Sequence, residues 1–167
     1  AGYALVAHNS IVQGSGSGSP NYWIGSSSQK QIRNNIFVGG GTGSWLGYNP
    51  NSSAADTVGI NSNDFNYNLC DTLSTSTRFA RWRSTDAYSL TSSWRANAIG
   101  FVNEANGVQG HPAFADTAAG NFKLTSASGA IDVGCRIPGV NTMPTLYRRL
   151  APDAGRFEYP TMFLEEK

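Results

Sequence analysis

The sequence predicts an all-β fold, a β-solenoid built from a few stacked coils and closed by a C-terminal cap region. Three short segments share a pattern in which a polar residue and Asn precede a small polar residue and strand-forming residues. These segments are HNSIV at 8–12, RNNIF at 33–37 and SNDFN at 62–66. Their asparagines, Asn9, Asn34 and Asn63, are separated by 25 and 29 residues. A period of this length, without a helix-length apolar periodicity, indicates short strands with one coil per period.

A second repeat supports the same interpretation. WIG at 23–25 recurs as WLG at 45–47, a spacing of 22 residues, and each precedes one of the asparagine segments. Bends between strands favour Asn and Gly, which tolerate left-handed backbone geometry. Asparagines stacked in successive coils can also bond the backbone of their neighbours. The alternative is a β-sandwich rich in Asn turns, because short strands at regular spacing suit either fold.

The chain is predicted to be a single domain, residues 1–167. Gly- and Ser-rich pieces at 13–21, 38–44 and 49–56 interrupt the coils, and strand-like material resumes after each. We therefore interpret them as loops that leave the solenoid between strands. The coils occupy 1–70, an excursion along their side occupies 71–109 with a short helix at 94–99, and 110–167 forms the closing coil and tail.

The composition disfavours several classes of protein. The formal net charge is +1 and charged residues make up 14% of the chain, below the usual quarter. Its Lys and Arg residues form no cluster that would bind nucleic acid, and no apolar run approaches the ~20 residues of a membrane span. Polarity carried by Ser, Thr, Asn and Gly is common in secreted β-proteins and in proteins that handle carbohydrate. We therefore expect a secreted or cell-surface location and a polysaccharide partner.

The two cysteines, Cys70 and Cys135, set no disulfide framework. They could pair in an oxidising compartment, or remain as two buried free thiols.

The C-terminal third carries the most specific pattern. It reads HPAFAD at 111–116, GNFKL at 120–124, SGAIDVG at 128–134 and APDAGRFEY at 151–159. This order resembles the terminal motif of right-handed parallel β-helix proteins of the pectate-lyase-like superfamily. The resemblance covers residues 86–159 well and the asparagine coils loosely. Four residues depart from the family pattern: His111, Gly129, Ala154 and Arg156 stand where the family usually has Asp, Pro, a bulky apolar residue and a small one.

The resemblance implies that the terminal segment closes a β-helix. The residues expected to plug the last coil and form its turn are Phe114, Phe122, Leu124, Ile131, Asp132 and Gly134. The first coil, around residues 5–12, shows no comparable cap, and about three coils is near the minimum for independent stability. Since an uncapped coil exposes unpaired strand edges, we expect upstream coils or a partner chain to cover the N-terminal edge. The chain would then be the C-terminal part of a longer β-helix.

The resemblance also implies a polysaccharide-directed function, with lyase activity as the favoured reaction. Such a lyase needs a base beside a uronate carboxylate, and calcium or a Lys/Arg cation to neutralise that carboxylate. The catalytic candidates are Lys30 and Arg33 on one strand and His8 one coil earlier. If the asparagine repeats stack, His8 and Arg33 occupy equivalent positions in adjacent coils, about 4.8 Å apart. The alternative is that all three are solvated surface residues.

Trp23, Trp45 and Tyr48 are the candidate substrate-binding residues. The two tryptophans recur at equivalent coil positions, and exposed stacked aromatics offer flat platforms for sugar rings. The alternative is that they point inward as part of the core. The sequence predicts no metal site, because no D-x-D-x-D or paired-carboxylate spacing occurs.

Three functions therefore stay open: a polysaccharide lyase, a non-catalytic glycan-binding or structural β-helix such as an adhesin or tailspike portion, and an assembly module that docks on another chain.

Overall fold

The computed structural model describes residues 4–12, 30–39, 45–49, 64–72, 78–82, 85–87, 102–140 and 151–155. Every regular element within these ranges is a short β-strand, and none is a helix. The all-β prediction is therefore confirmed for the described part of the chain. The predicted helix at 94–99 and most of the Gly- and Ser-rich pieces lie outside these residues.

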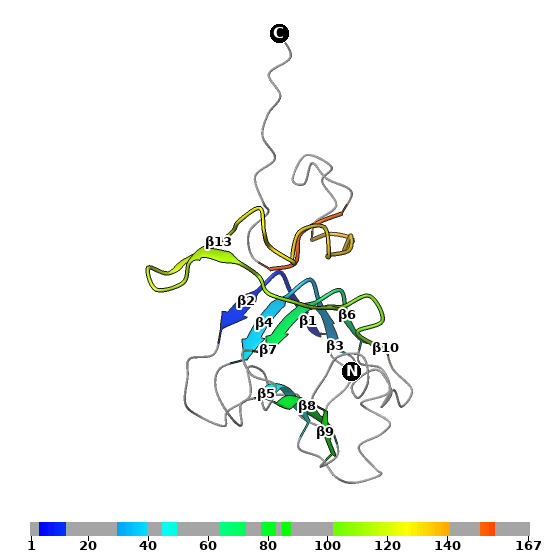
Figure 1. The fold of residues 1–167 in the computed structure, drawn as a ribbon. Helices are drawn as coiled ribbons and strands as arrows, with labels where there is room; N and C mark the ends of the chain where they lie inside the picture. The colour runs from blue at the N-terminus through cyan, green and yellow to red at the C-terminus, as the bar shows by residue number, and fades with distance from the viewer. Residues whose placement is uncertain are drawn as a thin grey trace.

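Eight of the strands form two parallel sheets, which diverge from a shared line of corners (Figure 1). The first sheet contains, in spatial order, β1 (Ala4–Ala7), β3 (Lys30–Arg33), β6 (Asp64–Asn66) and β10 (Val102–Asn103). The second contains, in the matching order, β2 (Ser10–Val12), β4 (Ile36–Gly39), β7 (Leu69–Thr72) and β11 (Val108–Gln109). All neighbours in both sheets pair in parallel.

Each strand of the first sheet leads through a short corner into a strand of the second, and we call this strand–corner–strand unit a rung. The first residue of every corner has a positive φ: 56° at His8, 57° at Asn34, 59° at Tyr67 and 52° at Glu104. A left-handed residue reverses the local bend of an extended chain, which turns the strand from one sheet into the other. Side chains other than Asn and Gly adopt this conformation at a cost of about 1 kcal/mol or more, so the surrounding contacts must hold it.

The strand pairing shifts the predicted asparagine repeat. Ile11 pairs with Phe37, and Phe37 with Cys70, so Asn9 aligns with Asn35 and Asn68. The predicted alignment of Asn9 with Asn34 and Asn63 is wrong. Its physical reason is that Asn34 itself occupies the left-handed position, while the asparagine that repeats is the residue after it.

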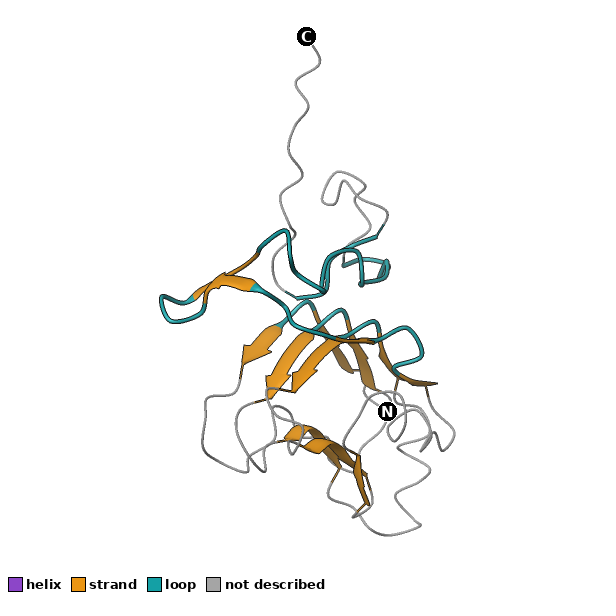
Figure 2. Cartoon of the chain, viewed as in Figure 1, coloured by secondary structure: helices purple, strands orange, loops and turns teal. Residues whose placement is uncertain are grey.

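The fourth rung extends the stack beyond the residues assigned to coils. Strands β10 and β11 pair with β6 and β7, so residues 102–109 continue the two sheets. Within the segment assigned to a side excursion, β8 (Arg78–Trp82) and β9 (Thr85–Ala87) join a third sheet with β5 (Trp45–Asn49). Strands β5 and β8 are parallel, and β9 is antiparallel to β8. This third sheet lies across the open side of the other two (Figure 2).

The core occupies both sides of the second sheet. Strand β4 is buried along its whole length, which is typical of a strand covered on both faces. Successive side chains alternate between faces, so Ile36 and Val38 lie on one side and Phe37 on the other. Burying Phe37 and Phe65, each 1% exposed, contributes roughly 2–3 kcal/mol per side chain.

The terminal segment begins with an antiparallel pair, β12 (Phe114–Asp116) and β13 (Asn121–Leu124). It then crosses the line of corners (Figure 1). Leu124, Ala130 and Ala154 share a buried cluster with Ile36 and Leu69, which belong to two different rungs.

The sequence predicts that the terminal segment plugs the last coil. In the structure, the terminal segment instead covers the side of the stack. Two of the expected plug residues, Phe114 and Ile131, are half-buried against the same cluster. Phe122 stacks edge-on against Phe114, with ring centroids 5.3 Å apart. Asp132 has a φ of 58°, as expected of a turn residue. The side is covered because Ile36, Leu69 and Val108, which follow three of the four corners, are apolar and would otherwise face water.

Candidate functional site

Polar side chains from successive rungs hydrogen-bond to one another along the line of corners. The asparagines among them form a ladder. The backbone N–H and the Nδ2 of Asn9 each donate to Oδ1 of Asn35, both over 3.0 Å. The backbone N–H and the Nδ2 of Asn35 donate in the same way to Oδ1 of Asn68, over 2.8 and 3.0 Å. Asn35 and Asn68 are fully buried, so these bonds form away from water, where an unpaired polar group would be costly.

The ladder also joins the rungs to the strands before them. Nδ2 of Asn35 donates to the carbonyls of Val6 and Arg33, and Nδ2 of Asn68 donates to the carbonyl of Ile32. Each buried amide therefore satisfies backbone groups that the corner removes from the sheet. We interpret the ladder as the feature that fixes the register of the corners.

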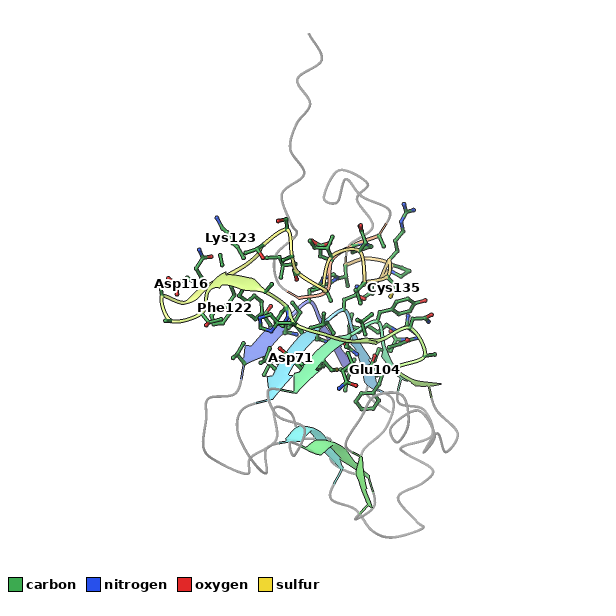
Figure 3. The ribbon with its side chains drawn as sticks, viewed as in Figure 1. Asp71, Glu104, Asp116, Phe122, Lys123 and Cys135 are labelled. Carbon is green, nitrogen blue, oxygen red and sulfur yellow. The ribbon has the colours of Figure 1, made fainter. Side chains whose placement is uncertain are left out.

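Glu104 ends the ladder at the fourth rung. Asn68 donates its backbone N–H to Oε2 of Glu104 over 3.2 Å and its Nδ2 to Oε1. Glu104 is 3% exposed and lies at the end of the stacked strands (Figure 3). A carboxylate is suited to this place because it only accepts hydrogen bonds, and bonds to an ionised acceptor are the stronger kind.

His8 connects the first rung to the terminal segment through Asn34. The amide orientation of Asn34 is set by Cys135, whose N–H donates to Oδ1 over 2.8 Å and whose carbonyl accepts from Nδ2 over 2.7 Å. The same Nδ2 lies 3.0 Å from Nε2 of His8, so Nε2 must accept and the imidazole is neutral. A backbone hydrogen bond with Gly155 then uses the remaining ring nitrogen, Nδ1, as its donor.

Burial lowers the pKa of His8 below its ordinary value of 6.5, against the opposing effect of the Gly155 bond. The folded protein thus takes up a proton at His8 less readily than the unfolded chain does. The contribution of neutral, buried His8 to the free energy of unfolding is fully present above pH 6.5. It is lost as the pH falls from 6.5 through the lowered pKa. We expect the free energy of unfolding, measured by urea titration from about pH 8 to about pH 5, to decline with acidification.

The His8→Gln variant should lose the part of this decline that His8 causes. The matched control is His111→Gln, which changes the chain's other histidine and should keep that part. An unchanged acid decline in His8→Gln would contradict the assignment.

The predicted catalytic residues are only partly brought together. Arg33 pairs with Ala7, not with His8, so the predicted equivalence of His8 and Arg33 is off by one residue. The reason is that His8 takes the left-handed corner position, whose counterpart in the next rung is Asn34. Lys30 pairs with Ala4 at the other end of β3, about 10 Å of strand away from Arg33.

Two of the predicted substrate-binding residues lie on the third sheet. Trp45 pairs with Arg78, and Tyr48 pairs with Arg81, so each aromatic position has a cationic residue beside it on the neighbouring strand. Trp23 lies outside the described residues.

The structure contains a His–Asp pair that was not predicted from the sequence. Nδ1 of His111 lies 2.7 Å from Oδ2 of Asp71, with the His111 side chain 72% and that of Asp71 14% exposed. The pair fastens the start of the terminal segment to β7. Its sequence signal was His111 itself, which stands where the terminal motif that the sequence resembles usually has Asp; an acid there would repel Asp71.

Both cysteines are free thiols, with Cys70 buried and Cys135 half-buried. Burial raises the pKa of Cys70 well above its ordinary value, and the negative charges of Glu104 and Asp71 raise it further. The Cys70 thiol is therefore protonated and unreactive at neutral pH.

The described residues contain no group of three or more His, Cys, Asp or Glu side chains that could hold a metal ion. Within the same part of the chain, no helix is both long and apolar enough to cross a bilayer. Comparison of the sequence with protein-family models and curated proteins, and of the fold with solved structures, found no match in any of the three.

Proposed function

We propose that the chain belongs to an exported, right-handed parallel β-helix protein that binds polysaccharide. The observation that carries this proposal is the in-register stacking of four rungs in two parallel sheets. The parallel pairing of β5 with β8 supports a third face for the second and third rungs. Parallel strands need a crossover connection between them, and winding in successive coils supplies it.

Binding is favoured over cleavage by the way the described polar residues are used. Both ring nitrogens of His8 are engaged within the protein, and Glu104 is buried at the end of the ladder. The aromatic positions Trp45 and Tyr48 remain the candidates for sugar contact, since aromatic side chains can stack on sugar rings. Arg78 and Arg81, their partners in register, add positive charge suited to a uronate polymer.

The binding test is affinity electrophoresis of the full chain in gels containing uronate polymers or neutral polysaccharides. We expect retardation by at least one uronate polymer, and a loss of affinity of about tenfold in Trp45→Ala and in Tyr48→Ala. Phe122→Ala is the matched aromatic control, because Phe122 lies on the terminal hairpin, and it should bind normally. Absence of retardation by every polymer would refute the proposal.

β-Elimination is the second candidate function, favoured by one observation. Burial lowers the pKa of His8, which keeps its imidazole neutral at neutral pH, as a general base requires. To act as the base, Nε2 of His8 would have to release Nδ2 of Asn34. Arg33 pairs with the residue before His8 and would neutralise the uronate carboxylate. Lys30 or calcium would be further sources of positive charge.

The cleavage test measures new unsaturated sugar ends on the same polymers, with and without added calcium. If His8 is the base, His8→Gln abolishes these ends while polymer binding is retained. If the unmodified chain produces no such ends on a polymer that it binds, cleavage is rejected and the binding proposal stands.

A further inference from the structure

Three hydrogen bonds join the terminal segment to the line of corners at Asn34. The side-chain amide of Asn34 exchanges two of them with the backbone of Cys135, over 2.7 and 2.8 Å. The carbonyl of Asn34 accepts the third from the backbone N–H of Gly155, over 2.7 Å. Cys135 and Gly155 lie on two stretches of the terminal segment that are bonded to each other, since Ala154 donates its N–H to the carbonyl of Ala130. We therefore expect the two stretches to separate from the corners together.

His8 contacts two residues of this junction. The Nδ2 of Asn34 has two hydrogens, of which one goes to the carbonyl of Cys135 and the other faces Nε2 of His8 over 3.0 Å. The ring also forms a hydrogen bond with the backbone of Gly155, in which Nδ1 is the donor. A neutral imidazole has one acceptor and one donor, and the junction uses both.

A proton on Nε2 removes the acceptor of the ring, so that its N–H faces the NH2 of Asn34, donor against donor. Rotating the amide by half a turn would present Oδ1 to His8, but it would also set Oδ1 against the carbonyl of Cys135 and Nδ2 against its N–H. Turning the ring away would instead give up the bond to Gly155. Each way of accommodating the proton breaks a hydrogen bond around Asn34, which is fully buried, where unpaired polar groups are costly.

We propose that His8 and Asn34 form an acid-sensitive clamp, which loosens the terminal segment from the line of corners as the pH falls while the strands of the rungs stay paired. Burial lowers the pKa of His8 below 6.5. The clamp is therefore closed above pH 6.5 and opens as the pH falls from 6.5 through the lowered pKa.

The opening is local, and it uncovers Ile36 and Leu69, which pack against residues of the terminal segment in the closed form. This inference goes beyond the acid loss of overall stability, because it names the segment that separates first. It does not depend on polysaccharide binding.

Other titratable and charged groups lie on the elements packed around His8. Among the described residues, those nearest to its contacts in the sequence are Arg33, Cys135, Arg136 and Asp153. The causes of the lowered pKa of His8 are burial and the Gly155 bond, and no charge is among them. The arginines keep their charge throughout the acid range. Asp153 is 1% exposed and its Oδ1 accepts the backbone N–H of Asp132, so the test must separate its response from that of His8.

Amide hydrogen exchange of the full chain, read by NMR at single residues at about pH 8 and about pH 5, tests the clamp. The reporters are the N–H groups of Cys135 and Gly155, which donate to Asn34. The references are the N–H groups of Leu69 and Val108, which donate to backbone carbonyls within the stack. Each rate is divided by the intrinsic exchange rate at the same pH to give a protection factor. We expect the reporters to be less protected than the references at both pH values, and their protection to fall about fivefold on acidification.

Three variants assign the acid response. His8→Gln cannot take up the proton, so the protection of the two reporters should stay the same at both pH values. The matched control, His111→Gln, changes the chain's other histidine and should keep the fall. In Asn34→Asp, a carboxylate can accept from the N–H of Cys135 and from protonated Nε2 alike, so acidification should no longer lower the protection of the reporters.

The opposite results each overturn the proposal. Reporters as strongly protected as the references would show that the terminal segment separates only when the whole chain unfolds. A fall that persists in His8→Gln would assign the acid response to another group, such as Asp153. A fall that persists in Asn34→Asp would show that the orientation of the Asn34 amide does not transmit the proton's effect.

Discussion

Replacing Glu104 by glutamine is expected to lower the free energy of unfolding by about 3 kcal/mol. Asn68 donates two N–H groups to the two carboxylate oxygens of Glu104, and a glutamine offers one oxygen and one NH2. Because the two donors of Asn68 reach separate oxygens, one of them would face the NH2 of the glutamine, donor against donor, at a residue that is 3% exposed. Urea unfolding followed by circular dichroism measures the change.

The control is Asp116→Asn, the same acid-to-amide change at an exposed residue whose Oδ1 accepts a bond from the backbone N–H of Ala119. An asparagine preserves that acceptor, so the expected change is within about 0.5 kcal/mol. A Glu104→Gln variant that is as stable as the original, or more so, would mean that the cost of burying the charge outweighs its two bonds.

Replacing Gly155 by alanine is expected to destabilise the protein by about 3 kcal/mol. Gly155 has a φ of 91°, which disfavours any L side chain, and a Cβ there would lie 2.5 Å from Cδ1 of Ile36 and 2.8 Å from Oγ of Ser10. Its backbone N–H also donates to the carbonyl of Asn34 over 2.7 Å. Overpacking would thus separate the terminal segment from the line of corners. The thermal unfolding midpoint and urea unfolding report the effect.

Gly139→Ala is the matched control, because Gly139 has a φ of 78° and no atom within 4 Å of the added Cβ. It should show only the backbone strain, about 1 kcal/mol. Equal losses in the two variants would mean that strain alone, and not contact with Ile36, explains the effect at Gly155.

The strand character, the parallel stacking and the role of asparagine could be predicted from the sequence, because each depends on local patterns. The register could not be predicted, since NN at 34–35 offers two asparagines and only the pairing of Ile36 with Ser10 and Leu69 decides between them. The third corner was placed at Asn63 rather than at Asn68, although NLC at 68–70 has the same Asn-apolar form.

For the candidate site, the sequence predicts which types of residue take part but not which residues contact one another. Asn34 contacts His8, 26 positions away, and Cys135, 101 positions away, and no local spacing encodes these contacts. Glu104 was missed because the ladder ends there with a different residue type, so a search for repeated asparagine passes over it.

At the corners, the spacing of the ladder residues along the sequence varies while the hydrogen bonds between them keep one pattern. Successive ladder residues are 26, 33 and 36 positions apart, yet in each pair the first residue donates its backbone N–H and its Nδ2 to the side-chain oxygens of the second. Connections between rungs can therefore differ in length by ten residues without altering the geometry of the stack, since closing a somewhat longer loop costs only a fraction of a kcal/mol. We therefore expect short peptide segments inserted into these connections to leave the ladder intact, so that the rungs would act as a frame for grafting.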